Sequence, residues 1–275
     1  MVAVVTDSAS NIPVELTAKL GITVVPLYVR LGDDVYRDGV DLRPGEFYRR
    51  LAESTEDAST SASSPSDFLE AFERTAQSEI VCVTVAEGMS SNHEHARLAA
   101  EQFSGRVEVV DSKSASMGEG FVAVEAARVA AANASFEDVV ARARTVSGNV
   151  SFIAMVDTFE YLKRSGRVTK LQAYAATMLD IKPVFAFRDG SAVPVARGRT
   201  RRKALARIVD EALREIGHRS AHVAVVHAAA EDEARDLLDR IGAAANVTEG
   251  LVTEVTPVVG VHVGPGLVGT AFFRD

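Results

Sequence analysis

The alternation of short apolar runs with longer helical patterns in the first half of the chain limits the fold more than any other feature. The runs expected to be strands are Val2–Val5, Ile22–Leu31, Ile80–Val85, Val107–Val110 and Val150–Val156. Most of them lack polar alternation, which is typical of strands covered on both faces. The stretches with a helical pattern between them are Pro13–Leu20, Ser66–Gln77, Asn92–Phe103 and Gly118–Ala132. This repetition predicts a mostly parallel sheet with helices on both sides.

After about residue 150 the regular alternation of strands and helices gives way to a pattern with more antiparallel pairing. Pro183–Phe187 and Ala192–Ala196 flank Asp189-Gly190, a dipeptide typical of a tight β-hairpin turn. The elements expected beyond it are a helix, a strand, a second helix and two closing strands: Arg202–Ile216, His222–His227, Glu231–Ile241, Thr256–Val263 and Leu267–Phe273. We therefore predict an α/β domain at residues 1–150 and a smaller α+β domain at residues 151–275. The segment Glu53–Ser66, rich in Ser, Thr and Ala, is expected to be an exposed loop.

Composition excludes several classes of protein. The chain has 275 residues, 47% of them hydrophobic, which is enough for a sizeable core. The formal net charge of −8 argues against a nucleic-acid-binding surface. The lone Cys82 excludes an internal disulfide and lies in an apolar run, so we expect it to be buried. No signal segment opens the chain and no run of about 18 apolar residues occurs, so we expect a cytoplasmic protein without membrane insertion.

A single histidine stands beside a rigid turn near the end of the sequence. His262 is followed, after one valine, by Gly264-Pro265-Gly266. The two glycines permit positive φ and let another group approach the backbone closely. One interpretation is a β-hairpin that carries a chance histidine. The other is an imidazole placed to hydrogen-bond an acid group.

Two segments rich in hydroxyl groups precede predicted helices. Thr60–Ser66 leads into one helix, and Ser90-Ser91-Asn92 opens another. Hydroxyls together with the unpaired backbone N–H groups of a helix N-terminus make an anion site, and two such sites could share one carboxylate. The alternative is ordinary N-capping by Ser66 and Ser91.

Three other patterns allow a structural explanation as well as a functional one. The strand ends Asp7-Ser8 and Asp111-Ser112 suit either a ligand site or helix capping. Gly118-x-Gly120 matches a dinucleotide motif weakly, and close packing of a helix on the sheet is favoured. His93-Glu94-His95 is expected to be a solvated helix start rather than a metal site, because residues two apart do not share a helix face.

Basic residues are concentrated in two segments of this acidic chain. One contains Arg197, Arg199, Arg201, Arg202 and Lys203, and the other contains Lys163, Arg164, Arg167 and Lys170. Clustered arginines favour an anionic partner or a phosphate group. A solvated charged face is the alternative.

In this order, the motifs resemble the DegV family of bacterial fatty-acid-binding proteins. The resemblance rests on Val5-Thr6-Asp7-Ser8, Thr60–Phe68, Val110-Asp111-Ser112, Asp157–Val168, Lys182-Pro183-Val184, Asp189-Gly190, Arg199-Thr200-Arg201 and His262–Gly266. It implies an N-terminal α/β domain and a smaller α+β domain, with one fatty acid between them. Some members present the bound carboxylate to a separate ATP-dependent kinase, which forms an acyl phosphate for phospholipid synthesis.

The resemblance also implies roles for individual residues. Ser61, Ser90 and His262 match the family's carboxylate-contacting positions. Ser91 and Asn92 stand where the family's L-S-G-T motif has glycine and threonine, and we include them in the ligand site. Basic positions implicated in kinase docking match Arg167 and Arg201.

The sequence therefore predicts a fatty-acid carrier that needs no cofactor, no metal and no catalytic residue of its own. The expected partners are a long-chain fatty acid and a fatty-acid kinase, with no nucleic acid. The alternative is a small-molecule kinase subunit or a hydrolase that uses the same pocket directly. A DNA-binding regulator is disfavoured by the net charge of −8.

Overall fold

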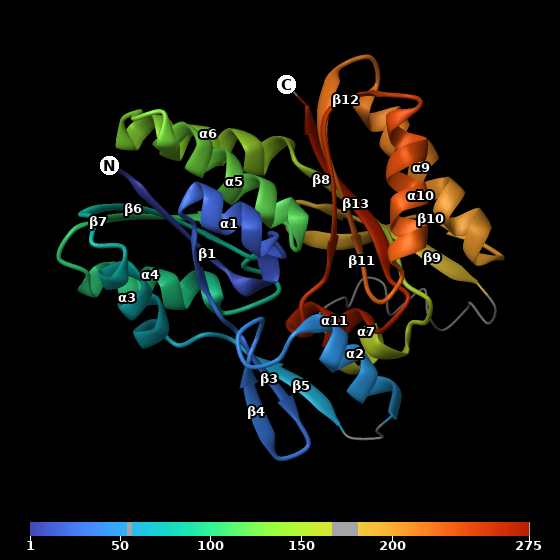
Figure 1. The fold of residues 1–275 in the computed structure, drawn as a ribbon, viewed down its shortest axis with the longest axis horizontal. Helices are drawn as coiled ribbons and strands as arrows, with labels where there is room; N and C mark the ends of the chain where they lie inside the picture. The colour runs from blue at the N-terminus through green and yellow to red at the C-terminus, as the bar shows by residue number, and fades with distance from the viewer. Residues whose placement is uncertain (54–56, 167–180, 275) are drawn as a thin grey trace.

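The computed structural model describes residues 1–53, 57–166 and 181–274, which form three β-sheets covered by helices (Figure 1). The first sheet has the strand order β2 (Thr23–Val25), β1 (Ala3–Asp7), β6 (Glu79–Thr84) and β7 (Arg106–Asp111), and every pairing in it is parallel. This confirms the parallel α/β architecture predicted from the alternating apolar runs.

Helices cover both faces of the parallel sheet (Figure 1). On one face lie α3 (Pro65–Arg74) and α4 (Asn92–Gln102), whose apolar side chains pack with Val5, Ile80 and Cys82 of the strands. The other face carries α1 (Val14–Leu20), α5 (Met117–Ala131) and α6 (Phe136–Asn149). Cys82 is fully buried in this core, as expected.

The second sheet has six strands in the order β10 (Ser191–Gly198), β9 (Lys182–Arg188), β8 (Ser151–Met155), β13 (Val268–Arg274), β11 (Ser220–His227) and β12 (Asn246–Glu254). Only β11 and β12 pair in parallel. The predicted β9–β10 hairpin is confirmed, with positive φ at Asp189 and Gly190. α9 (Arg201–Ile216) and α10 (Glu231–Gly242) cover one face, while Phe273 on the other contacts Phe121 of α5 edge to face.

A third, antiparallel sheet corrects two expectations. Its order is β4 (Asp34–Arg37), β3 (Tyr28–Leu31) and β5 (Ala58–Ser61), and α2 (Pro44–Glu53) follows β4. The run Ile22–Leu31 is therefore two strands in different sheets, separated at Pro26, which has no N–H for a ladder. The expected loop Glu53–Ser66 contains β5.

The segment Thr256–Val263 was expected to be a strand, and this prediction is wrong. Pro257–Val263 forms helix α11, which packs near the short helix α7 (Glu160–Ser165). Pro257 occupies the first helical position, where its missing N–H is no loss, and the carboxylate of Asp38 accepts the N–H of Val258 at 2.9 Å. His262 therefore lies in the last helical turn rather than in a hairpin. Leu267–Phe273 is a strand, β13, as predicted.

Among the helices that the structure describes, none is long and apolar enough to cross a membrane. The strands before residue 150 belong to the parallel and three-stranded sheets, and those after it to the six-stranded sheet. The division into domains at residue 150 stays a prediction.

Candidate functional site

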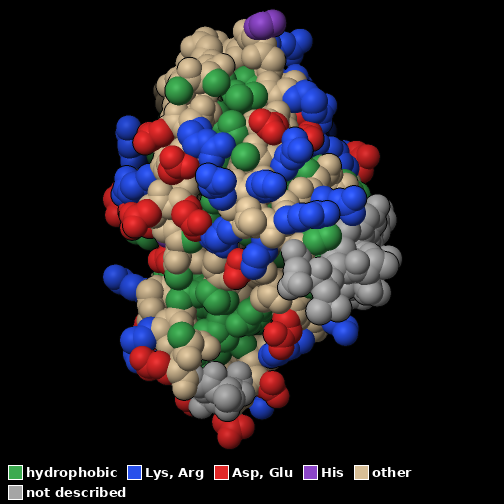
Figure 2. Space-filling view, turned by 90° about the vertical axis from the view of Figure 1, so that its right-hand side faces the viewer, with side chains coloured by type: hydrophobic (Ala, Val, Ile, Leu, Met, Phe, Trp, Pro, Cys, Tyr) green, Lys and Arg blue, Asp and Glu red, His purple; other side chains and the backbone are tan. Residues whose placement is uncertain are grey.

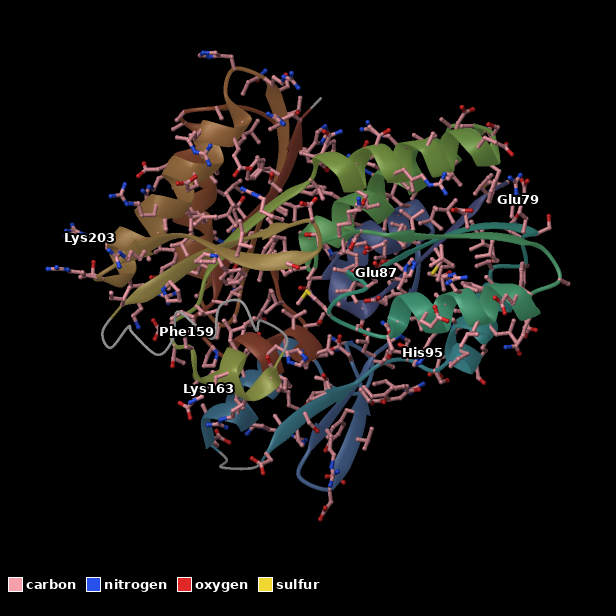
Figure 3. The ribbon with its side chains drawn as sticks, turned by 180° about the vertical axis from the view of Figure 1, so that it is seen from behind. Glu79, Glu87, His95, Phe159, Lys163 and Lys203 are labelled. Atoms are coloured by element: carbon pink, nitrogen blue, oxygen red, sulfur yellow. The ribbon has the colours of Figure 1, made fainter. Side chains whose placement is uncertain are left out.

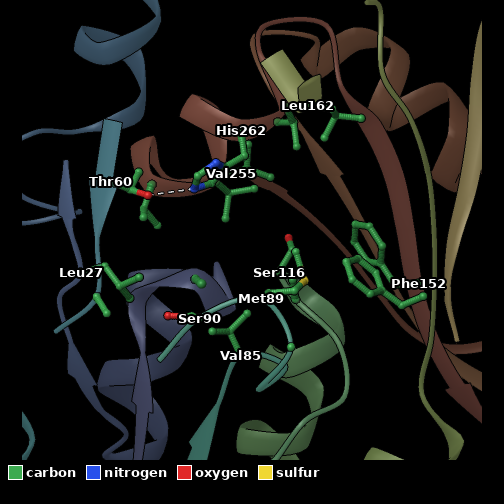
Figure 4. A pocket seen from close by; sticks show the side chains of 18 of the residues that line it. Leu27, Thr60, Val85, Met89, Ser90, Ser116, Phe152, Leu162, Val255 and His262 are labelled. Atoms are coloured by element: carbon green, nitrogen blue, oxygen red, sulfur yellow. Dashed lines mark hydrogen bonds between the residues drawn. The ribbon is translucent and has the colours of Figure 1, made fainter. Parts of the chain in front are cut away.

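A cavity of about 510 Å³ lies at the carboxyl ends of the parallel strands, between them and the six-stranded sheet (Figure 4). Most of its wall is apolar. Phe152, Phe185 and Phe187 come from β8 and β9, while Val258, Val259 and Val263 come from α11. Ligands of open α/β sheets bind at this edge, because the loops after the strands converge there.

Polar groups gather on the side of the cavity formed by β5 and α11. The hydroxyl of Thr60 and Nε2 of His262 are 2.9 Å apart, and both side chains are half-buried (Figure 4). Ser61, the next residue on β5, also lines the cavity and is exposed. The structure thus brings the two predicted residues Ser61 and His262 to one wall, although they are far apart in the sequence.

The predicted segment Ser90-Ser91-Asn92 divides between the cavity and the interior. Ser90 and Ser91 line the cavity. Asn92 does not; it is buried, and its amide oxygen accepts the backbone N–H of Ser63 at 3.0 Å. Asn92 therefore fixes the loop after β5 to the start of α4. This position corrects its placement among the cavity residues.

The capping prediction at the two serine-rich segments is also wrong in detail. Ser64, not Ser66, caps α3, and it forms a capping box with Asp67. Ser91 occupies the N-cap of α4 but makes no side-chain capping bond. The hydroxyl of Ser90 accepts the N–H of Asn92 at 3.2 Å.

The strand end Asp7-Ser8 fixes the floor of the cavity. Asp7 is fully buried, and its two carboxylate oxygens accept the N–H groups of Ala9 at 3.0 Å and Val85 at 3.1 Å. The hydroxyl of Ser8 accepts the N–H of Leu27 at 3.1 Å. Ala9, Val85 and Leu27 all line the cavity. Asp7 and Ser8 therefore hold in place the three backbone segments that contribute Ala9, Val85 and Leu27 to the cavity wall.

Asp7 has an acidic neighbour in the interior. The carboxyl group of Glu119 on α5 is fully buried beside it and accepts the hydroxyl of Thr6 at 3.0 Å. Burial raises the pKa of both carboxyl groups, and the charge of Asp7 raises the pKa of Glu119 further. The two backbone N–H groups lower the pKa of Asp7 against the effect of burial, so a proton shared by the pair is favoured on Glu119.

The glycines after His262 allow the close approach that the sequence predicted. Gly264 has φ +71°, and a Cβ there would lie 2.2 Å from the ring of Tyr161. Gly266 has φ +84°, and a Cβ there would lie 3.1 Å from the Arg201 guanidinium. These contacts involve the protein's own side chains and fix the end of α11 against α7 and α9.

Arg201 is engaged inside the protein. Its guanidinium forms an ion pair with Glu233, contacts Asp157 at 3.3 Å and donates to the backbone oxygen of Gly266 at 2.7 Å. It therefore anchors the loop behind His262. Arg167 lies outside the described residues. The docking role of both arginines stays a prediction.

Four neighbours of Arg201 form an exposed group, which we name the α9 cationic cluster: Arg197, Arg199, Arg202 and Lys203. None of the four makes an ion pair with the described residues. Figure 2 shows Lys and Arg side chains gathered on this side of the molecule, and Lys203 projects away from the ribbon in Figure 3.

His93 and His95 are structural rather than solvated. Nδ1 of His95 lies 2.7 Å from the backbone oxygen of Ser63, and Nδ1 of His93 lies 3.1 Å from the Thr84 hydroxyl. Both rings are half-buried, which corrects the expected solvated helix start. The described residues contain no group of three or more His, Cys, Asp or Glu that could hold a metal ion. Gly120 packs tightly against the backbone of Ser10, as expected of close helix packing.

Three polar residues of the cavity wall were not assigned to the site from the sequence, namely Thr60, Glu87 and Ser116, although Thr60 begins the hydroxyl-rich segment Thr60–Ser66. Thr60 lies one residue before the predicted Ser61, and a strand assignment for this segment would have drawn attention to it. Ser116 lies between β7 and α5, where its orientation depends on an unusual backbone conformation. The sequence carries no signal for that conformation.

Comparisons with known proteins all point to one family. The sequence pattern of the DegV family, described as a family of uncharacterised proteins, matches residues 1–275. A DegV domain-containing protein of Streptomyces coelicolor is 34% identical over 272 residues, which cover 98% of this chain and 96% of that protein.

Solved structures show the same architecture. A DegV family protein from Thermus thermophilus, described as binding fatty acid, is 31% identical with a TM-score of 0.94, over 100% of this chain and 99% of that one. DegV from Bacillus subtilis, described as a fatty acid binding protein, is 26% identical with a TM-score of 0.87, over 100% and 99% of the two chains. Because the family pattern and the Streptomyces relative both span nearly all of this sequence, the protein belongs to the DegV family.

Proposed function

We propose that this protein binds one long-chain fatty acid, with its acyl chain in the cavity and its carboxylate at the β5–α11 side. The observation that carries the proposal is an apolar cavity of about 510 Å³ with hydroxyl and imidazole groups gathered on one wall. This volume is within the range of small-molecule sites, roughly 300–1,000 Å³. The fatty-acid-binding relatives from Thermus thermophilus and Bacillus subtilis support it.

Hydrocarbon burial supplies most of the affinity in this proposal. Each buried CH₂ contributes roughly 0.8 kcal/mol, so a long chain binds tightly through its tail alone. The carboxylate, in contrast, must exchange its water for other donors. Among the described residues that line the cavity, none is Lys or Arg. The hydroxyls of Thr60, Ser61 and Ser90 and the imidazole of His262 are the donors that we assign to it, and Ser91 completes this wall.

We further propose that a separate kinase phosphorylates the bound ligand in the cytoplasm. A carboxylate oxygen attacks the terminal phosphorus of ATP, the bond to ADP breaks, and an acyl phosphate for phospholipid synthesis results. The ligand itself supplies the nucleophile, so the protein acts as a carrier. Arg167 and Arg201 remain the predicted docking residues, and the exposed α9 cationic cluster extends this surface toward an anionic partner.

Organic extraction of the purified protein followed by mass spectrometry tests the binding proposal. We expect about one fatty acid per chain, because burial of the acyl chain slows its release. The alternative, a hydrolase or small-molecule kinase subunit that uses the pocket directly, predicts a chain free of fatty acid. A lipid-free protein that also fails to bind added fatty acid would contradict the proposal.

Titration of the delipidated protein tests the assigned residues. Ser61→Ala, Ser90→Ala, Thr60→Val and His262→Ala should each weaken binding by about 1.5–3 kcal/mol, the usual contribution of a hydrogen bond to a charged group. Ser66→Ala is the matched control, because Ser66 is exposed and does not line the cavity. Normal affinity in a variant would remove that residue from the site.

Charge reversal in the α9 cationic cluster tests the docking surface. Arg199→Glu and Arg202→Glu should lower acyl-phosphate formation by an added fatty-acid kinase about tenfold and leave fatty-acid affinity unchanged, since rim charges govern association. Arg219→Glu, an exposed arginine just beyond the other end of α9, is the control for charge. Arg201→Glu is less informative, because it also breaks the contacts of Arg201 with Glu233 and Gly266. Full activity of both cluster variants would exclude this docking surface.

A further inference from the structure

The hydroxyl of Ser116 is a polar group in the cavity wall that the binding of a plain fatty acid does not explain. The side chain is 1% exposed, and its oxygen has no hydrogen-bond partner among the described residues. Ser116 lines the cavity, and Figure 4 shows its oxygen pointing into it. An unpaired buried hydroxyl is unfavourable by about 1–3 kcal/mol, so native structures normally give such a group a partner.

Helix capping does not account for this serine. Ser116 occupies the N-cap of α5, where a serine normally accepts an N–H from the first turn, yet it makes no such bond. Its backbone has φ 54° and ψ −145°, close to a region that only glycine visits readily.

Two backbone hydrogen bonds hold this strained conformation. The N–H of Ser116 donates to the oxygen of Ala9, and its carbonyl accepts the N–H of Gly120, both at 2.9 Å. The fold therefore maintains a backbone that turns the hydroxyl away from the helix and into the cavity. Strain of this kind is concentrated at functional sites.

The position of Ser116 separates it from the groups assigned to the carboxylate. In Figure 4 it lies across the cavity from the Thr60–His262 bond, on the side toward Phe152. A ligand with its carboxylate at Thr60 and His262 and its tail among the phenylalanine rings would pass Ser116 along its acyl chain. A plain hydrocarbon chain offers no hydrogen bond at that point.

We propose that the cavity is adapted to an acyl chain that carries an oxygen, as a hydroxyl or keto group, and that Ser116 hydrogen-bonds this oxygen. The inference rests on the proposed function and specifies the ligand class for the same cavity. A site built to hydrogen-bond a ligand oxygen discriminates against the analogue without it, because the buried group is then left unpaired. The preference for the oxygenated chain should be about tenfold.

The test compares stearic acid with a set of hydroxystearic acids that differ in the carbon bearing the hydroxyl, titrated into the delipidated full chain. We expect one positional isomer to bind about tenfold more tightly than stearic acid. Ser116→Ala should abolish this preference by raising the affinity for stearic acid, because the variant has no buried hydroxyl for that ligand to leave unpaired. Ser116→Gly should give the same result. Because glycine adopts this backbone conformation without strain, the second variant shows whether a folding defect explains the result with alanine.

Ser114→Ala is the matched control. Ser114 is buried two residues away with an unpartnered hydroxyl, but it does not line the cavity, so the preference should persist in this variant. The inference is overturned if no isomer binds more tightly than stearic acid. It is equally overturned if Ser116→Ala weakens both ligands alike, since Ser116 would then contact the carboxylate. Failure of the unaltered protein to bind stearic acid and every isomer would contradict the proposed function itself.

Discussion

The two carboxylate oxygens of Asp7 each accept one backbone N–H, from Ala9 and from Val85, and an amide at this position could accept only one of them. We expect Asp7→Asn to lower the free energy of unfolding by about 1–3 kcal/mol, the cost of an unpaired buried N–H. Glu119→Gln should change it by less than about 1 kcal/mol, because burial and the charge of Asp7 raise the pKa of Glu119 and favour its neutral form, and glutamine still accepts the Thr6 hydroxyl. Urea denaturation of the two variants at neutral pH measures the difference. Equal losses would show that Asp7 has no special role in holding the cavity floor.

At the same scale, the sequence identified cavity residues that their local context marks, and it missed those whose placement depends on distant partners. His262 was found because two glycines follow it within four residues. Thr60 was noted only as the start of a hydroxyl-rich segment, because its partner, His262, lies on another element. Ser116 was missed because its orientation depends on the Ala9 backbone, which is far away in the sequence. Hydrogen bonds between distant segments leave no pattern in a single sequence.

Among the elements, α11 shows why a local pattern can predict the wrong structure. Four of its seven residues are valines, which favour strands. The helix forms because Pro257 begins it, Asp38 accepts an N–H of its first turn, and Gly260 packs closely against Phe47 and Tyr48. Tertiary contacts therefore outweigh intrinsic propensity here. The parallel strands and their helices were predicted correctly because their apolar runs and helical periods agree with their tertiary surroundings.

Asp38 makes the stability of this region dependent on pH. Burial raises the pKa of its carboxyl group from 3.8 to about 6, so the folded state holds the proton more strongly than the unfolded state. The contribution of this group to stability is thus fully present below the unfolded pKa and is lost as the pH rises through about 6. The shift from 3.8 to about 6 corresponds to a loss of about 3 kcal/mol in the free energy of unfolding at pH values well above 6.

Asp38→Asn should remove this dependence, since asparagine can still accept the N–H of Val258 but does not ionise. We expect the variant to be more stable than the unaltered protein at about pH 8 and of similar stability at about pH 4. Urea denaturation of both proteins across this range provides the measurement. Parallel stability curves for the two proteins would show that Asp38 does not titrate as its burial implies.

Taken as a whole, the molecule places its cavity where the three sheets meet. Phe185 comes from the six-stranded sheet, Val85 follows the parallel sheet, and Thr60 belongs to the three-stranded sheet. A bound fatty acid would contact all three. We therefore expect ligand at about 100 times its Kd to raise the free energy of unfolding by about 2.7 kcal/mol.

Amide hydrogen exchange locates that stabilisation. Protection should increase in β5 and in β9 together, because each contributes residues to the cavity wall. His262→Ala, measured at the same fatty-acid concentration, should give a smaller increase in both strands. An increase confined to one sheet would contradict the placement of the ligand between them.

The central position of β13 in the six-stranded sheet determines when the cavity can first form during synthesis of the chain. β13 pairs with β8 on one side and with β11 on the other, so β8, β9 and β10 join β11 and β12 only through residues 268–274. Protein chains leave the ribosome N-terminus first, and these residues are made after every other strand described. The cavity wall is thus complete only once β13 has been made, and a product truncated before β13 would leave β8 and β9, which carry the phenylalanines of the wall, without their link to β11.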